Sequence, residues 1–347
     1  MPDPASNSYK NLNVLSPDPI CAALFLPDMD LPVSTTEGHF IRSHFPAPEI
    51  VSTYWSLPVT GEVFEPLNLS YDDLLKMPSH EVTSLMECAG NSRSTMQPPA
   101  EGVQWNNGGL SVSRWKGVSM KTVLDQAGFK GTASDVLFVG ADSGTESHAE
   151  GTLVYEMSVP MEKLLHPDSI LAYEMNGETL PKDHGYPIRL ITPGWYGMTS
   201  VKWVVSIVVM DRPNRGFHEM DYWIYPAADG KSDPKARRVT TLKVKSLISS
   251  PEKGDILPVG KHKVSGVAWS GDGQITKVEV SIDDDRTWHP AKLEEPSGSY
   301  SWQHWEYDWD ASAAGHTLLR SRATDSAGNV QPMLATWNLR GYEVNSI

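Results

Sequence analysis

The sequence predicts an α+β fold in two domains: a mixed, sheet-rich domain over residues 38–237 and an all-β sandwich over residues 238–347. Three observations predict this. A chain of 347 residues is long for one hydrophobic core and suggests two domains. Apolar stretches with strand-like alternation dominate the first part. Short strands at regular spacing, separated by turn residues, fill the second part and are typical of a sandwich.

The first part of the chain begins with residues 1–37, which are rich in Pro, Asp and Asn and predict an irregular surface arm. Alternation then predicts strands over 55–63 and 81–86. Residues 119–128 predict a helix with a serine cap and a glycine stop. Three further apolar strands are expected at 136–140, 188–192 and 201–210. A short helix ended by a proline is expected at 161–166.

The second part begins where the composition changes near residue 230. Residues 229–235 form a polar stretch with little to bury, as expected of a linker. Turn signals lie at 271–273 and 283–285. The strands expected around them are 242–248, 262–269, 275–282, 302–309 and 316–323.

The composition excludes several classes of partner. Hydrophobic residues make up 39% and charged residues 21%, which is ordinary for a soluble globular protein. A net charge of −14 argues against nucleic acid and anionic membrane surfaces, because both attract basic proteins. No apolar run is long enough for a membrane helix. Residues 1–5 show no secretory signal, so we expect the cytoplasm, or the periplasm if a signal was removed.

Cys88 lies in the most informative segment, after a predicted strand. Gly90 lets the backbone approach another group closely, and Arg93 supplies a charge that favours thiolate and can hold an oxyanion. A thiolate binds soft or high-valent metals or acts as a nucleophile. Most lone cysteines are instead buried and structural, which is our interpretation of Cys21.

The two cysteines also limit the cofactors that the chain can hold. They cannot supply the four thiolates of an iron–sulfur cluster, and no Cys-x-x-Cys-His motif for covalent haem is present. We therefore expect neither haem nor an iron–sulfur cluster, and expect electrons to leave to a separate acceptor.

The segment 86–94 resembles the cysteine motif of the sulfite oxidase family of molybdenum enzymes. Segments 40–46, 183–189 and 193–203 resemble further motifs of that family in the same order, and four ordered motifs are more specific than one. The resemblance runs from about residue 38 to residue 347. It implies a molybdopterin-binding domain of the sulfite oxidase type, followed by an immunoglobulin-like domain that forms a homodimer.

The resemblance also implies roles for individual residues. Cys88 would be the only protein ligand to molybdenum, with one molybdenum per chain. Arg42, Arg93 and Tyr222 would line the substrate pocket. The contacts to the pterin and its phosphate would come from Arg42, His44, Asp142, His184, Arg189, Ser200, Val201 and Lys202.

The charges of these segments support the same conclusion independently. In an acidic chain they bring several cationic side chains, which would bind a phosphate or a dianion if they converge. Each residue also has an ordinary structural interpretation. His44 and His184 are compatible with core or surface histidines, Asp142 with a structural carboxylate, and Tyr222 with packing beside Trp223.

The family implies oxidation of sulfite to sulfate by oxygen-atom transfer, with an external electron acceptor such as a cytochrome or oxygen. The same fold can act on nitrate or an organic sulfoxide, and Ser92 stands where some relatives carry a second arginine. Cys88 could instead be a nucleophile with a histidine base, or the chain an interaction protein with an inert cysteine. The electron acceptor and any nucleotide on the pterin stay open.

Overall fold

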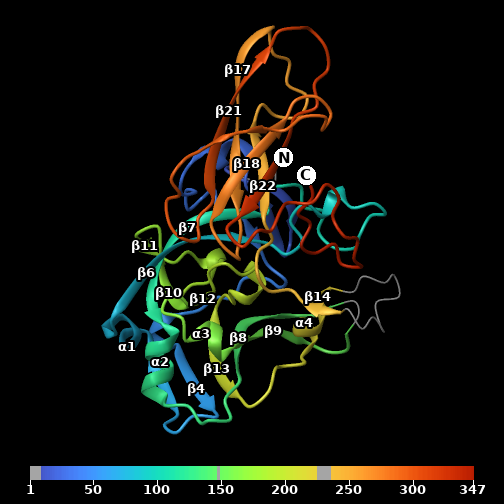
Figure 1. The fold of residues 1–347 in the computed structure, drawn as a ribbon. Coiled ribbons are helices and arrows are strands. Elements are labelled where there is room, and N and C mark those ends of the chain that lie inside the picture. The colour runs from blue at the N-terminus through green and yellow to red at the C-terminus, as the bar shows by residue number, and fades with distance from the viewer. Residues whose placement is uncertain (1–8, 147–148, 225–235) are drawn as a thin grey trace.

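The computed structural model describes residues 9–146, 149–224 and 236–347. Figure 1 shows the strands after residue 245 gathered in its upper part, above the mixed domain that contains all four labelled α-helices. The α+β class and the all-β second domain are confirmed. The predicted linker 229–235 lies outside the described residues.

Two five-stranded sheets form the mixed domain. The order of the first is β5-β4-β13-β8-β9, and β13 pairs with β4 in parallel. The order of the second is β11-β10-β7-β6, with β12 paired to β10. The bounds of the first sheet are β4 Ser56–Gly61, β5 Leu67–Ser70, β8 Asp135–Gly144, β9 Leu153–Pro160 and β13 Val204–Met210. Those of the second are β6 Ser79–Glu87, β7 Leu110–Ser119, β10 Ile170–Met175, β11 Glu178–Thr179 and β12 Arg189–Ile191.

The helices of this domain are short. The α-helices are α1 Tyr71–Lys76, α2 Met120–Ala127, α3 Met161–Leu164 and α4 Phe217–Asp221. The 3-10 turns are η2 Leu26–Asp30, η3 Ser52–Tyr54, η4 Arg93–Thr95, η5 Lys182–His184 and η6 Gly197–Thr199. Helix α2 confirms the predicted helix, and Gly128 ends it at a φ of 58°. Ser119 occupies the predicted N-cap position, but its side chain makes no capping hydrogen bond.

The prediction of an irregular arm is wrong for its described part. Strands β1 (Asn13–Pro17) and β2 (Ile20–Ala23) form a sheet with β3 (Ile41–Arg42). Cys21 and Met29 are buried, so this segment contributes to the protein interior. Of the residues that suggested irregular chain, Pro17, Asp18 and Pro19 lie at the turn of the β1–β2 hairpin, whereas Pro27, Asp28 and Asp30 lie in the 3-10 turn η2. The pairing matters for function because it fixes β3, which carries Arg42.

The second domain contains a four-stranded and a three-stranded sheet. Their orders are β16-β17-β21-β20 and β19-β18-β22. Their bounds are β16 Lys245–Ser250, β17 Gly260–Trp269, β18 Ile275–Ser281, β19 His289–Pro290, β20 Lys292–Leu293, β21 Gln303–Ala311 and β22 Arg320–Asp325. Before them, β14 (Trp223–Ile224) pairs with β15 (Arg237–Arg238).

The two domains share a hydrophobic core. One continuous cluster of buried side chains contains strand residues of the mixed domain, such as Leu57 and Phe138, together with Trp269 and Trp302 of the second domain. Several hydrogen bonds also cross between them, including Tyr300 Oη to Asp168 Oδ2 at 2.9 Å. The second domain is therefore part of the surroundings of any site near that junction. In the described parts of the chain, no helix is long and apolar enough to cross a membrane.

Candidate active site

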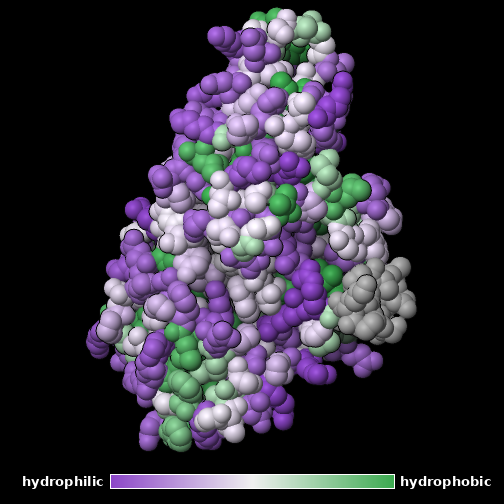
Figure 2. Space-filling model, in the orientation of Figure 1, coloured by the Kyte–Doolittle hydropathy of each residue, from purple (hydrophilic) through white to green (hydrophobic). Residues whose placement is uncertain are grey.

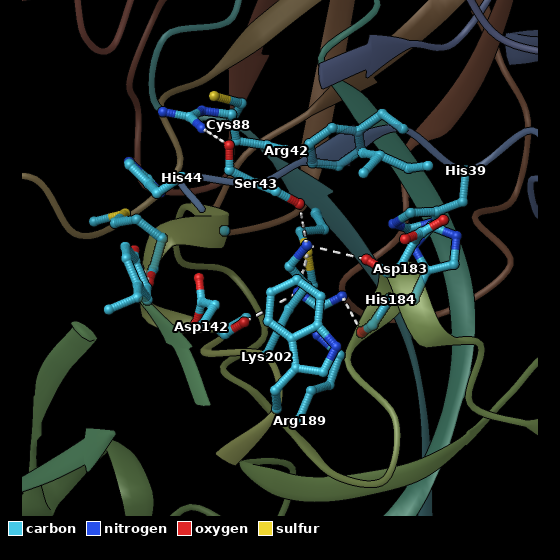
Figure 3. A pocket seen from close by; sticks show the side chains of 18 of the residues that line it. His39, Arg42, Ser43, His44, Cys88, Asp142, Asp183, His184, Arg189 and Lys202 are labelled. Atoms are coloured by element: carbon cyan, nitrogen blue, oxygen red, sulfur yellow. Dashed lines mark hydrogen bonds between the residues drawn. The ribbon is translucent and has the colours of Figure 1, made fainter. Parts of the chain in front are cut away.

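A cavity with about 650 Å³ of empty space brings together most of the residues that the sequence singles out. Figure 3 shows these side chains converging from separate segments of the chain. The predicted residues that line it are Arg42, His44, Cys88, Asp142, His184, Arg189, Ser200, Lys202 and Tyr222.

Cys88 directly follows β6 and is held between the ends of β6 and β7. Its backbone N–H donates to Gly109 O at 2.8 Å, and its carbonyl accepts from the Asn91 N–H at 2.9 Å. The Asn91 side chain closes the turn, because its Oδ1 accepts from the Gly109 N–H at 3.0 Å. These bonds fix the backbone that presents the thiol to the cavity.

Arg42 lies beside Cys88 in Figure 3. It sits opposite Cys21 across the β2–β3 pair, with its Nη1 3.8 Å from the Cys21 sulfur, and it also donates to the carbonyl of Ser43. Burial opposes its charge, but the neighbouring Cys21 and Tyr222 raise the pKa of Arg42 above its ordinary value. This guanidinium is therefore a permanent cation at the cavity wall.

The Cys88 thiol experiences opposing influences. Its buried surroundings raise the pKa of Cys88, whereas the nearby guanidinium groups of Arg42 and Arg93 lower it. Burial is the larger influence, so without a metal the thiol is protonated at neutral pH. A metal ion bound to a thiol deprotonates it outright. This chemistry suits a metal ligand better than a free nucleophile.

Lys202 and Arg189 supply the cations at another part of the cavity. Lys202 Nζ donates to Ser43 Oγ at 2.8 Å and to Asp183 O at 3.0 Å, as the dashed lines in Figure 3 show. Arg189 donates to His184 O and Ser200 O, both at 3.0 Å. Burial lowers the pKa of Arg189 to about 9, so its guanidinium stays charged at neutral pH, and lowers that of Lys202 to about 7, so Lys202 gains its full charge when an anion binds beside it.

Asp142 is the buried carboxylate of the cavity, carried by β8. Burial raises the pKa of Asp142, and the ammonium of Lys202 opposes this. Burial also lowers the pKa of His184 to about 3, helped by the charges of Arg189 and Lys202. His184 is therefore neutral at pH 7 and presents one ring donor and one ring acceptor.

Tyr222 and His44 form a hydrogen-bonded pair. The Tyr222 hydroxyl lies 3.0 Å from His44 Nε2, and the His44 ring stacks on Tyr155 with 4.8 Å between ring centroids. Burial lowers the pKa of His44 and raises that of Tyr222, so both are neutral near pH 7. Sequence reasoning left Tyr222 open to an ordinary packing role; the structure places Tyr222 in the cavity lining.

Two predicted residues are not among the cavity-lining residues. Arg93 donates from Nε to Arg340 O at 2.7 Å and from Nη1 to Val103 O at 2.8 Å, and its guanidinium lies over the Tyr342 ring. Val201 is buried, and its carbonyl accepts from the Leu190 N–H at 2.9 Å. Arg93 thus holds loops in place, and its charge also lowers the pKa of Cys88.

Sequence reasoning missed several lining residues. Ser43 and Asp183 belong to the motifs that were singled out, so their position beside Arg42 and His184 was the available signal. His39 directly precedes the first motif and hydrogen-bonds through Nδ1 to Ser113 Oγ at 2.9 Å. Tyr155 had no local signal, because only the fold brings β9 to His44.

The cavity fits a metal–pterin group with an anionic tail. Within the described ranges, three buried polar atoms of lining residues have no hydrogen-bond partner: Asp142 Oδ1, Arg189 Nε and His39 Nε2. Buried polar groups normally have partners, so these atoms suit a ligand rich in donors and acceptors. No group of three or more His, Cys, Asp or Glu that could hold a metal occurs among the described residues. One thiolate therefore fits a metal that arrives already held by a cofactor.

Comparison with known proteins agrees with this geometry. The family described as "Oxidoreductase molybdopterin binding domain" matches residues 44–218, half of the chain. "Mo-co oxidoreductase dimerisation domain" matches residues 236–347. Sulfite oxidase of Gallus gallus is 36% identical over 96% of this chain and 74% of that protein. The chain belongs to the sulfite oxidase family of molybdenum-cofactor oxidoreductases.

Other members of the sulfite oxidase family show the same relationship. The mitochondrial sulfite oxidase of Mus musculus is 35% identical over 91% of this chain, which spans 62% of that longer protein. The crystal structure of the sulfane dehydrogenase SoxCD from Paracoccus pantotrophus superposes with a TM-score of 0.82 at 30% identity. The superposition covers 95% of the present chain and 84% of the SoxCD chain. Molybdopterin is therefore the cofactor that the family membership supports.

Proposed function

We propose that this chain oxidises sulfite to sulfate in a molybdenum-dependent reaction. Sulfite and water give sulfate, two protons and two electrons. The observation that carries the proposal is that the Cys88 thiol and the Arg42 guanidinium line one cavity that also contains Arg189 and Lys202. In a chain of net charge −14, this concentration of cations is suited to a small dianion beside a metal–thiolate centre. Relatives named sulfite oxidase support the choice of substrate.

Different cavity residues would contact different parts of the cofactor. Cys88 would bind the metal through its thiolate. Lys202 and Arg189 would offset the phosphate charge, and Asp142 and His184 would hydrogen-bond the pterin. The bound cofactor supplies the metal centre that transfers an oxygen atom and takes up two electrons.

Arg42 and Tyr222 are the groups that we assign to the substrate. Arg42 carries a planar guanidinium, which holds an oxyanion through two parallel N–H donors. Tyr222 lines the cavity, and its neutral hydroxyl lies 3.0 Å from His44 Nε2. A neutral His44 with its proton on Nε2 would donate to the Tyr222 oxygen, and the phenolic O–H would then be exchanged between Tyr155 and the anion. Both contacts orient sulfite and offset its charge.

Electrons then pass to a separate acceptor, such as a cytochrome or oxygen. We also propose a homodimer formed through the second domain, which the dimerisation-domain match supports. Closed two-fold dimers are the commonest oligomers of soluble proteins.

The test uses protein made in a host that synthesises the molybdenum cofactor. We expect close to one molybdenum per chain by elemental analysis, and sulfite-dependent reduction of ferricyanide. Cys88→Ser should lose turnover, because a hydroxyl is a harder and far less acidic ligand than a thiol. Nitrate and an organic sulfoxide, each assayed with a reduced dye, form the comparison arms. Full activity of Cys88→Ser, or faster turnover of nitrate or the sulfoxide than of sulfite, would overturn the proposal.

A further inference from the structure

A buried charge pair joins the Cys88 loop to the second domain. Glu87, the residue before Cys88, lies with its Oε1 3.8 Å from Lys245 Nζ of β16, and both side chains are almost fully buried. Trp269, also from the second domain, donates from Nε1 to Glu87 Oε2 at 2.9 Å. Buried charges are costly unless they are paired and hydrogen-bonded, so this arrangement constrains both partners.

Lys245 also contacts the other end of the same loop. Its Nζ donates to Ser92 Oγ at 2.6 Å and to Val344 O at 2.8 Å. Ser92 adopts a left-handed backbone conformation with φ 67°, and its Oγ donates to Asn107 Oδ1 at 2.6 Å. Such a conformation is uncommon for a residue with a side chain and persists where its surroundings fix it.

Glu87 and Lys245 therefore hold the loop from both ends. Glu87 Oε1 accepts from Asn91 Nδ2 at 3.0 Å, and Asn91 in turn closes the turn around Cys88. The loop from Cys88 to Ser92 lies between the carboxylate of Glu87 and the hydroxyl of Ser92, and one ammonium group contacts both. In this chain the cation behind the loop comes from the other domain.

We propose that Lys245 is a positioning residue for Cys88, so that the second domain takes part in building the molybdenum site as well as in dimerisation. The proposal rests on the proposed function, because it takes Cys88 as the metal ligand. Groups that orient a metal ligand through hydrogen bonds typically contribute about 10–100-fold to metal affinity or activity. Lys245 acts in this way through Glu87, Asn91 and Ser92.

The test measures backbone hydrogen exchange on the cofactor-free protein and molybdenum content on the loaded protein. Lys245→Gln should speed exchange at the amides of residues 88, 91 and 92 by about tenfold or more, because bonds to a charged group are the stronger ones. Molybdenum per chain should fall, and the thiolate-to-molybdenum absorption should shift. The double variant Glu87→Gln/Lys245→Gln removes both buried charges and should recover only the part of each signal that comes from leaving Glu87 without its cation, because the contact with Ser92 stays lost.

Two further variants separate positioning from general stability. Tyr300→Phe removes another bond between the domains, to Asp168 Oδ2 at 2.9 Å, and should leave the Cys88 loop unchanged. Ser92→Ala keeps the buried charge pair and removes the bonds of the Ser92 hydroxyl to Lys245 and Asn107, so it tests the idea if Lys245→Gln does not fold. Exchange that rises equally across the whole protein, or a folded Ser92→Ala with wild-type exchange and molybdenum content, would overturn the inference. A wild-type protein without molybdenum would overturn the proposed function instead, while the exchange result would stand.

Discussion

At the scale of single residues, two arginines near Cys88 have different surroundings. Arg42 lines the cavity, whereas the guanidinium of Arg93 donates to the carbonyls of Val103 and Arg340. Both were expected in the substrate pocket. Spacing along the chain brings Arg93 close to Cys88, but the left-handed turn at Ser92 and the packing of Tyr342 decide where its side chain points. A sequence pattern contains neither of these facts.

Substitution of the two arginines should therefore have different consequences. Arg42→Met should lower kcat/KM for sulfite about tenfold to hundredfold, the effect of losing a charge-assisted hydrogen bond to an anion. Arg42→Lys should recover only part, because an ammonium lacks the planar fork. Arg93→Met should mainly lower the free energy of unfolding. Steady-state kinetics per bound molybdenum and urea unfolding of all three variants measure this, and an equal loss of kcat/KM for Arg42→Met and Arg93→Met would contradict it.

The buried histidines should make the cofactor-free protein sensitive to acid. His184 has a pKa of about 3 when folded and about 6.5 when unfolded. Between these values the unfolded chain binds a proton that the folded protein does not, so stability falls as pH falls from about 6.5 towards 3. The contribution is about 1.4 kcal/mol per pH unit. Burial lowers the pKa of His39 and His44 as well, so they act in the same direction.

Urea unfolding of the cofactor-free protein at pH 7, 6 and 5 tests this expectation. His184→Gln should reduce the slope of stability against pH below pH 6.5 by about 1.4 kcal/mol per unit. His316→Gln changes an exposed histidine of the second domain and serves as the matched control. A slope in His184→Gln equal to that of wild type would show that His184 becomes protonated in the folded protein.

At the scale of elements, local patterns predicted the strands better than their partners. Alternation located the strand at 275–282, observed at Ile275–Ser281, and the strand at 81–86 that extends to Ser79–Glu87. It missed β1 and β2, which are short strands: β1 pairs with β2, and β2 also pairs with the distant β3. Helix α2 was found because its apolar period and its glycine stop are both local.

The candidate site divides in the same way. Residues within the recognised motifs, such as His184 and Lys202, line the cavity as expected. Lys245 and Tyr155 belong to no motif. They lie on strands distant in sequence, and only the fold brings Lys245 to the Cys88 loop and Tyr155 to His44. Sequence reasoning therefore found the residues of the proposed chemistry but not those that hold them in place.

The sheet that presents Cys88 depends on a close approach between β7 and β10. A Cβ added at Gly117 would overlap the backbone carbonyl of Leu171, so these strands can approach only at a glycine. Gly117→Ala should cost about 1–3 kcal/mol of unfolding free energy, as expected for overpacking. Gly131→Ala is the matched control, because nothing lies within 4 Å of the added atom, and it should be neutral or slightly stabilising. Urea unfolding decides; equal stability of the two variants would contradict the role given to Gly117.

At the scale of the whole molecule, an acidic protein surrounds a cationic cavity. The net charge of −14 repels anions at long range, while Arg42, Arg189 and Lys202 attract them at short range. Polar residues cover most of the face shown in Figure 2, and apolar residues appear in small groups, including some over the second domain at its upper end. Very exposed apolar side chains of that domain are Ile256 at 97% and Leu334 at 84%.

These features lead to an expectation for the dimer. Light scattering at micromolar concentration should give twice the 38.3 kDa mass of one chain. Because each copy carries a net charge of −14, added salt should screen the repulsion and leave the dimer as strong or stronger. At least one of Ile256→Asp and Leu334→Asp should weaken it, since a buried unpaired carboxylate at an interface is costly. Tyr54→Asp, at an equally exposed position of the mixed domain, should not. A wild-type monomer would exclude the dimer. Dissociation by Tyr54→Asp alone would place the dimer contact outside the second domain.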